Sequence, residues 1–254
     1  MTVMTLSRAA GVAALAAALA AAPAGAQSLA DRVAAANDGK VRFSFETRDG
    51  VCGNGRNISI RDHGTSEWEA DCEPGPARVL LTVRDGEVRS LDTRVGGRWK
   101  EGTGAADMGM IDPSEASTYL LSLAAKMRDD GEDAVFAATI ARGVAVWPDL
   151  LRLARDRKVP EDTRTAAVFW LGQAAGDAAT AALDSIVVEP GDREVRKAAV
   201  FALSQRPENE GVPALLRVAR THPDPQLRRD AMFWLGQSED PRALELFEEV
   251  LTAE

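Results

Sequence analysis

The residue types that most often carry chemistry are scarce in this chain. It holds only two cysteines, Cys52 and Cys72, and only two histidines, His63 and His222, among 254 residues. A structural zinc site takes four Cys or His ligands, so two cysteines without a neighbouring histidine are too few. A redox pair is usually spaced Cys-x-x-Cys, whereas these two cysteines lie 20 residues apart. The spacing predicts one structural disulfide between Cys52 and Cys72 in an oxidising compartment.

Two polar stretches contain residue types found in catalytic or phosphate-binding motifs. Residues 62–66 read Asp-His-Gly-Thr-Ser, but a catalytic triad requires its members to meet in space, and sequence neighbours do not satisfy this. We interpret them as an exposed loop. Residues 50–56 are rich in glycine, yet they lack a Gly-Lys-Ser/Thr ending and no helical pattern follows. A tight bend beside the disulfide is the better interpretation.

The first 26 residues have the pattern of a secretory signal peptide. Arg8 is their only charge, residues 9–22 are almost all apolar, and Ala-Gly-Ala precedes Gln27. We therefore predict a periplasmic or secreted protein, with an uncleaved N-terminal anchor as the alternative. No later stretch is long and apolar enough to predict a membrane span, so none is expected after cleavage.

Residues 27–104 predict a small β-rich domain that holds the disulfide. Apolar and polar residues alternate over 41–45 and 58–60, which is typical of half-buried strands. Two further strands, 78–84 and 87–95, flank Asp85-Gly86, a strong signal for a tight hairpin. Strands without intervening helices favour an antiparallel sheet, and the whole chain is predicted to be an α+β protein of two domains. Residues 105–113 are predicted to be a linker.

A repeated phrase organises the second half of the chain. Residues 167–173 read Ala-Val-Phe-Trp-Leu-Gly-Gln, and close variants occupy 199–205 and 231–237, so the copies are 32 residues apart. A weaker copy lies at 134–137. A fixed period of this size is typical of stacked repeats. We predict an α-solenoid of about four two-helix units over 114–254, with the phrase on the first helix of each unit.

The repeats resemble the short bacterial form of the HEAT-like family, which includes repeats of the PBS-lyase type. The resemblance rests on the pattern Asp-x-x-Val/Leu-Arg at 192–196 and 224–228, on the Leu-Gly or Leu-Ser helix end, and on Asp-Pro-Arg-Ala-Leu at 240–244. It implies that aspartates and arginines at these positions bridge adjacent turns and have a structural role. The matching residues are Asp192, Arg196, Asp224 and Arg228, whereas Arg164 has Pro160 where the family has the acid.

Aromatic residues recur on the flank of the first helices. Each copy of the phrase carries a phenylalanine about 100° from the centre of the buried face, given 3.6 residues per turn. One interpretation is that these side chains pack between neighbouring repeats. The other is a partly exposed stripe that binds a peptide or protein, because clustered aromatic residues favour interfaces. The candidate stripe comprises Phe136, Phe169, Trp170, Phe201, Phe233 and Trp234.

These patterns favour a non-enzymatic scaffold whose partner is another protein or peptide. The net charge of −9 disfavours nucleic acid, which requires a basic surface. We predict no cofactor and no metal, because a hydroxylase of the HEAT-like type would require His-Glu pairs on successive repeats and this chain has two histidines. Two alternatives stay open: an enzyme or enzyme accessory of the HEAT-like lyase type, and an accessory protein for envelope stress or sensing.

Overall fold

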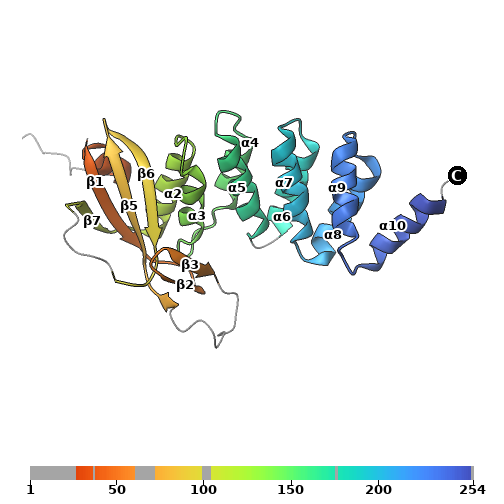
Figure 1. The fold of residues 1–254 in the computed structure, drawn as a ribbon, viewed down its shortest axis with the longest axis horizontal. Helices are drawn as coiled ribbons and strands as arrows, with labels where there is room; N and C mark the ends of the chain where they lie inside the picture. Colours follow the sequence, from red (N-terminus) through yellow and green to blue (C-terminus); the bar gives the residue numbers. More distant parts are fainter. Residues whose placement is uncertain (1–26, 37, 61–71, 99–103, 175–176, 253–254) are drawn as a thin grey trace, which may run out of the picture.

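The chain forms a β-rich unit at one end of a row of paired helices (Figure 1). The structure is a computed structural model, and it describes residues 27–36, 38–60, 72–98, 104–174 and 177–252. The predicted signal peptide (1–26) and the loop at 62–66 lie outside these ranges. The two-domain α+β arrangement that the sequence predicts is confirmed.

The larger sheet contains four strands in the order β6-β5-β1-β7. Its central strands, β1 (Gly39–Phe45) and β5 (Ala77–Arg84), are antiparallel and alternate between buried and partly exposed side chains, as the sequence pattern predicts. The predicted hairpin joins β5 to β6 (Glu87–Arg94). Its two turn residues, Asp85 and Gly86, both have positive φ, 53° and 74°, which is the backbone conformation that a two-residue turn of this type requires.

The fourth strand, β7 (Ala106–Met110), corrects the prediction of a linker at 105–113. It pairs in parallel with β1, and its register shifts between Arg42 and Ser44. An ion pair between Arg42 and Asp107, 2.7 Å apart, supports this pairing. The chain between the sheet and the helices is therefore an edge strand that leads directly into the first long helix.

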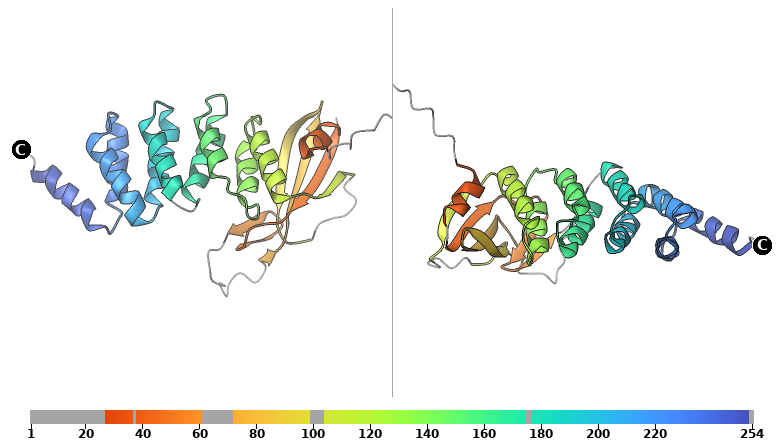
Figure 2. Two further views of the ribbon diagram at one scale, coloured as in Figure 1. Left: turned by 180° about the vertical axis from the view of Figure 1, so that it is seen from behind. Right: turned by 90° about the horizontal axis from the view of Figure 1, so that it is seen from above.

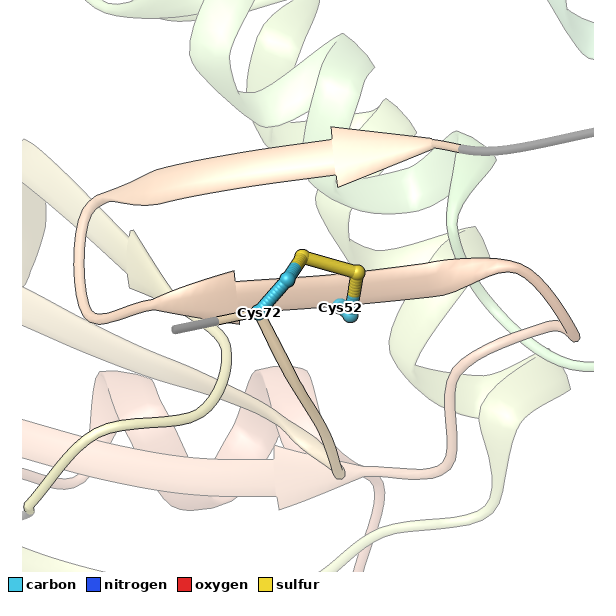
Figure 3. Close-up of a disulfide and its surroundings, with 2 residues drawn as sticks. All are labelled: Cys52 and Cys72. Atoms are coloured by element: carbon cyan, nitrogen blue, oxygen red, sulfur yellow. A yellow bond between two sulfur atoms is a disulfide. The ribbon is translucent and has the colours of Figure 1, made fainter. Parts of the chain in front are cut away.

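A second, three-stranded sheet holds the disulfide. Its order is β3 (Asn57–Ile60), β2 (Val51–Asn54) and β4 (Glu73–Pro74), and all pairs are antiparallel. The predicted bond between Cys52 and Cys72 is confirmed, with Cα atoms 5.2 Å apart (Figure 3). The bond ties the middle strand to the residue that precedes β4. Closing a loop of this length stabilises a fold by about 3 kcal/mol in the chain-entropy account.

The main sheet packs on the first helices and shares one hydrophobic core with them. The inward side chains of β1 include Phe43, whose ring meets Tyr119 of α2 edge-on at 6.3 Å. This burial raises the pKa of the Tyr119 hydroxyl to about 12. Two backbone hydrogen bonds also join the β unit to the end of α3. Arg48 N–H donates to Ile140 C=O, and Arg142 N–H donates to Glu46 C=O. The β unit therefore covers the end of the helical array.

The helices form two rows, because each repeat contributes a first and a second helix (Figures 1 and 2). A short helix, α1 (Leu29–Ala34), begins at the Ser28 cap and lies against α2. The first helices carry the repeated phrase; they are α3 (Gly131–Thr139), α5 (Glu161–Gly172), α7 (Arg193–Ser204) and α9 (Pro225–Leu235). The second helices are α2 (Pro113–Ala124), α4 (Trp147–Arg155), α6 (Asp177–Val188), α8 (Glu208–Thr221) and α10 (Pro241–Thr252).

The final helix, α10, is less buried than the helices before it. Phe247 is only partly buried and Val250 is 48% exposed. The buried residues of α10 are Ala243 and Leu246 instead. Figure 1 shows that α10 projects away from α8 and α9. It packs mainly on α8, and Leu244 and Leu251 stay exposed.

The first helices α5 and α7 approach closely where small residues face each other. A Cβ atom added at Gly172 would lie 2.9 Å from the Cβ atom of Ala202 on the next first helix. The equivalent glycine of the last repeat, Gly236, has its nearest neighbour at 3.4 Å, an ordinary contact. The two glycines occupy the same position of the phrase, but only Gly172 is required for packing.

We expect these two glycines to respond in opposite directions to alanine. Gly236→Ala should raise the free energy of unfolding by up to about 1 kcal/mol through helix propensity. Gly172→Ala should lower the free energy of unfolding by about 1–2 kcal/mol, because the steric clash with Ala202 costs more than the gain in helix propensity. Urea unfolding of both variants measures the difference. Two stabilising substitutions would contradict the close approach of α5 and α7.

Candidate partner-binding surface

The predicted aromatic stripe lies on one row of helices, the first helices of the repeats. Phe169 and Phe233 are exposed, with 41% and 59% of their surface accessible. Phe136 and the two tryptophans are partly buried against the core, and Phe201 is half-buried. Both interpretations of the stripe therefore describe part of it: some rings pack between repeats, and two phenylalanines are available to a partner.

The rings form two separate groups and not one continuous ladder. In the first group Trp170 lies 5.4 Å from Phe136 of the preceding repeat and 5.1 Å from Phe169 of its own helix. In the second group Trp234 lies 5.0 Å from both Phe201 and Phe233. We call these groups the Trp170 group (Phe136, Phe169 and Trp170) and the Trp234 group (Phe201, Phe233 and Trp234).

The interruption has a steric cause. Ala202 occupies the position that Trp170 and Trp234 hold in the neighbouring repeats, and it faces Gly172 across a close contact between first helices. A tryptophan at that position would not fit beside α5. The alternation of alanine and tryptophan along the repeats therefore divides the stripe into two groups.

An open groove of about 400 Å³ lies beside the Trp170 group, between α3 and α5. Its aromatic wall consists of Phe169 and Trp170, and Thr165 and Ala166 line its floor. Acidic side chains from the first turns of the two helices form the rest. We call this the acidic groove, and its seven lining residues are Glu132, Asp133, Asp162, Thr165, Ala166, Phe169 and Trp170.

The carboxylates of the acidic groove have no basic partner in the described part of the chain. No Lys or Arg lines the groove, and Glu132, Asp133 and Asp162 form none of the ion pairs there. Burial is the main reason that the pKa of Asp133 is raised, and the nearby charges of Asp130 and Asp92 add to the effect. The three carboxylates without a basic partner give the groove a negative potential, which favours cations.

Elsewhere in the array, carboxylates and arginines pair between successive repeats. Buried Arg164 forms an ion pair with Asp192 of the next repeat, and it also donates to Val159 C=O at 3.0 Å. Arg196 lies 3.9 Å from Asp224, which also pairs with Arg193 at 3.2 Å. Each acid is thus supplied by the following repeat.

This pattern corrects one expectation for the repeat-structural residues. Arg164 does have an acid, because Asp192 takes the place of the one missing at Pro160. Arg228 instead donates to two carbonyl oxygens in the turn before α9, those of His222 and Pro223, at 2.7 and 3.3 Å. These residues are structural connectors between repeats and do not line the acidic groove.

Comparison with known proteins supports the same architecture. The family model for HEAT repeats matches residues 147–231 and, in a second match, residues 185–254. Residues 147–254 are HEAT repeats. The match begins at α4, but α2 and α3 pack together as the later pairs do and extend the row toward the sheet. No curated protein and no solved structure matches the chain.

Sequence reasoning missed one connector between the HEAT repeats, Arg206. Its guanidinium is buried at the end of α7 and donates to the carbonyl oxygens of Gly172 and Ala174 at 3.2 and 2.5 Å. It also pairs with Glu210 at 2.7 Å. Arg206 therefore satisfies carbonyl groups at the end of the preceding first helix. The signal was available, since an arginine just after a helix complements the exposed carbonyls of such an end.

The residues considered for catalysis have structural roles where they are described. His222 is buried; its Nδ1 accepts from Asp224 N–H and its Nε2 donates to Val187 C=O, both at 3.1 Å. Both cysteines are in the disulfide. Among the described residues, no three His, Cys, Asp or Glu side chains are grouped to hold a metal ion. No helix in the same part of the chain is long and apolar enough to cross a membrane.

The raised pKa of Asp133 predicts a pH-dependent stability change. The folded state holds the Asp133 proton more tightly than the unfolded state, so ionisation at neutral pH destabilises the fold. We expect Asp133→Asn to raise the melting temperature at pH 7 and to have no effect at pH 3, where the carboxyl is protonated in both states.

Asp107→Asn is the control with the opposite sign. The pKa of Asp107 is lowered by a hydrogen bond from Gly109 N–H and by Arg42, so its charge stabilises the fold above the usual carboxyl range. This variant should lower the melting temperature at pH 7, with the difference lost as pH falls. Thermal unfolding from pH 3 to pH 7 measures both. A loss of stability at pH 7 for Asp133→Asn would contradict the unfavourable burial of the Asp133 charge.

Proposed function

We propose that this chain is an exported, non-enzymatic scaffold that binds another protein through the first helices of its HEAT repeats. The single observation that supports this most is the exposure of Phe169 and Phe233, 64 residues apart, on the same row of helices. Each is supported by a tryptophan of its own helix, in edge-on contact at about 5 Å. Large aromatic side chains held in place in this way are typical anchors of protein interfaces.

The solenoid supplies the rigidity that such anchors require. Successive repeats share one hydrophobic core, and ion pairs such as Arg164–Asp192 join them. The sheet covers one end of the row, so the first repeat is not left with an exposed apolar face. Because its helices are already fixed relative to one another, this surface loses little conformational entropy on binding, which favours affinity.

Export is part of the proposal, and two features support it. Residues 1–26 have the pattern of a signal peptide, and the disulfide between Cys52 and Cys72 is of a kind that persists in oxidising compartments. The lyase-type enzyme and the envelope sensor remain the alternative hypotheses, and no feature of the described residues favours either over a scaffold.

Partner capture tests the role of the aromatic row. The double variant Phe169→Ala/Phe233→Ala should lower the affinity for a captured partner at least tenfold, since two interface anchors together contribute more than about 1.4 kcal/mol. The control is Val188→Ala/Leu244→Ala, which removes two equally exposed apolar side chains, 67% and 65% accessible, from the second helices. Quantitative affinity capture from envelope extract, followed by titration of the partner, compares them. Equal losses in both variants would contradict the proposed surface.

Mass spectrometry of the protein expressed in a Gram-negative host tests export. We expect the periplasmic fraction to hold a chain that begins at Gln27 and carries one disulfide. The intact mass should increase on reduction by the two hydrogens of that bond. A chain that keeps residues 1–26 and two free thiols in the cytoplasm would contradict the localisation.

A further inference from the structure

The acidic groove combines features that select one kind of ligand. Three carboxylates, those of Glu132, Asp133 and Asp162, line it from two helices, together with an aromatic wall. The wall includes Trp170, whose ring is held between two phenylalanines at 5.4 and 5.1 Å. An indole face beside unpaired carboxylates attracts an organic cation both through the ring and through charge. We propose that the acidic groove binds an arginine-rich segment of the partner protein.

Arginine fits this groove for stated physical reasons. Its guanidinium is planar, stacks on aromatic rings and donates to two carboxylate oxygens at once. Arginine is already the partner of several carboxylates that link repeats, such as Asp192 and Asp224. The groove carboxylates have no such partner among the described residues, and a basic segment from outside would satisfy them in the same way. The inference rests on the proposed scaffold function and adds the chemistry of its partner.

The Trp234 group provides an internal comparison with similar aromatic geometry and different charge. When the repeated phrases are aligned, Lys197 occupies the position of Glu132, and Arg229 that of Thr165. Gln226 and Ala198 replace the two aspartates of the groove. The aromatic support is conserved between the two groups, with Trp234 lying 5.0 Å from each of its phenylalanines. Asp230 occupies the position of Ala166 and accepts a hydrogen bond from Gln226 at 2.7 Å. With two basic side chains and one carboxylate at the aligned positions, the second site carries less negative charge than the first.

The test measures the binding of two labelled peptides, Gly-Ser-Arg and Gly-Ser-Glu each repeated four times, to the purified protein by fluorescence anisotropy. We expect the arginine peptide to bind and the glutamate peptide not to bind. The variant Glu132→Gln/Asp133→Asn/Asp162→Asn should weaken the arginine peptide at least tenfold. Because none of these carboxylates pairs with a described basic residue, the variant should still fold, and its thermal unfolding checks this.

The matched control is Lys197→Gln/Arg229→Gln at the second site, which should change the affinity less than twofold. Equal binding of both peptides, or a loss in the control variant alone, would overturn the proposal. Self-association of the protein that is lost in the control variant would also overturn the proposal. The occupant of the groove would then be Lys197 and Arg229 of a second copy of the chain. The two proposals can be separated. If the captured partner binds more weakly to the Phe169/Phe233 variant but the arginine peptide does not bind the protein, the scaffold function is supported and only the arginine-rich ligand is rejected.

Discussion

The close approach of neighbouring first helices determines much of this structure. At the contact between Gly172 and Ala202 the helices are so near that even one added methyl group would have to displace its neighbour. Small side chains let the repeats stack and share one core, which individual two-helix units could not form alone. The same contact excludes a tryptophan from α7. As a result, the aromatic residues gather into two groups and the surface has two distinct parts.

Charge is distributed along the array in a similarly specific way. The side chains of Arg164 and Arg206 are nearly inaccessible. Arg164 pairs with Asp192 of the next repeat, and Arg206 donates to the carbonyl groups of Gly172 and Ala174 of the preceding one, so both fix how one repeat sits on the next. Removing one partner of such a pair costs far more than an exposed pair contributes, since a buried charge would be left alone. The carboxylates of the acidic groove take no part in this network. Their mutual repulsion does not stabilise the fold, and a bound cation would relieve it.

The features that the sequence predicts well are those that depend on local or periodic signals. The repeated phrase identifies the first helices, Asp85-Gly86 identifies the hairpin, and the spacing of the two cysteines identifies the disulfide. These signals are local because turn conformation, helix periodicity and chain closure involve residues that are near in sequence.

Long-range features could not be predicted in the same way. Strand β7 reads Ala-Asp-Met-Gly-Met, with no alternation, and it becomes a strand only by pairing with β1 more than 60 residues earlier. The acidic groove likewise depends on two units, since Glu132 and Asp162 come from different repeats. Predicting strand β7 or the acidic groove requires knowing how the helices and strands pack in space. The local pattern of residues along the sequence does not contain that information.

The most direct test of the account follows the indole N–H signals of the protein by NMR while the arginine peptide is added. Trp170 and Trp234 are assigned by replacing each with phenylalanine. The account predicts that the Trp170 signal moves progressively with peptide concentration while the Trp234 signal stays in place, because three carboxylates without a basic partner line the groove beside Trp170. A shift of Trp234 alone, or no shift of either signal, would contradict it.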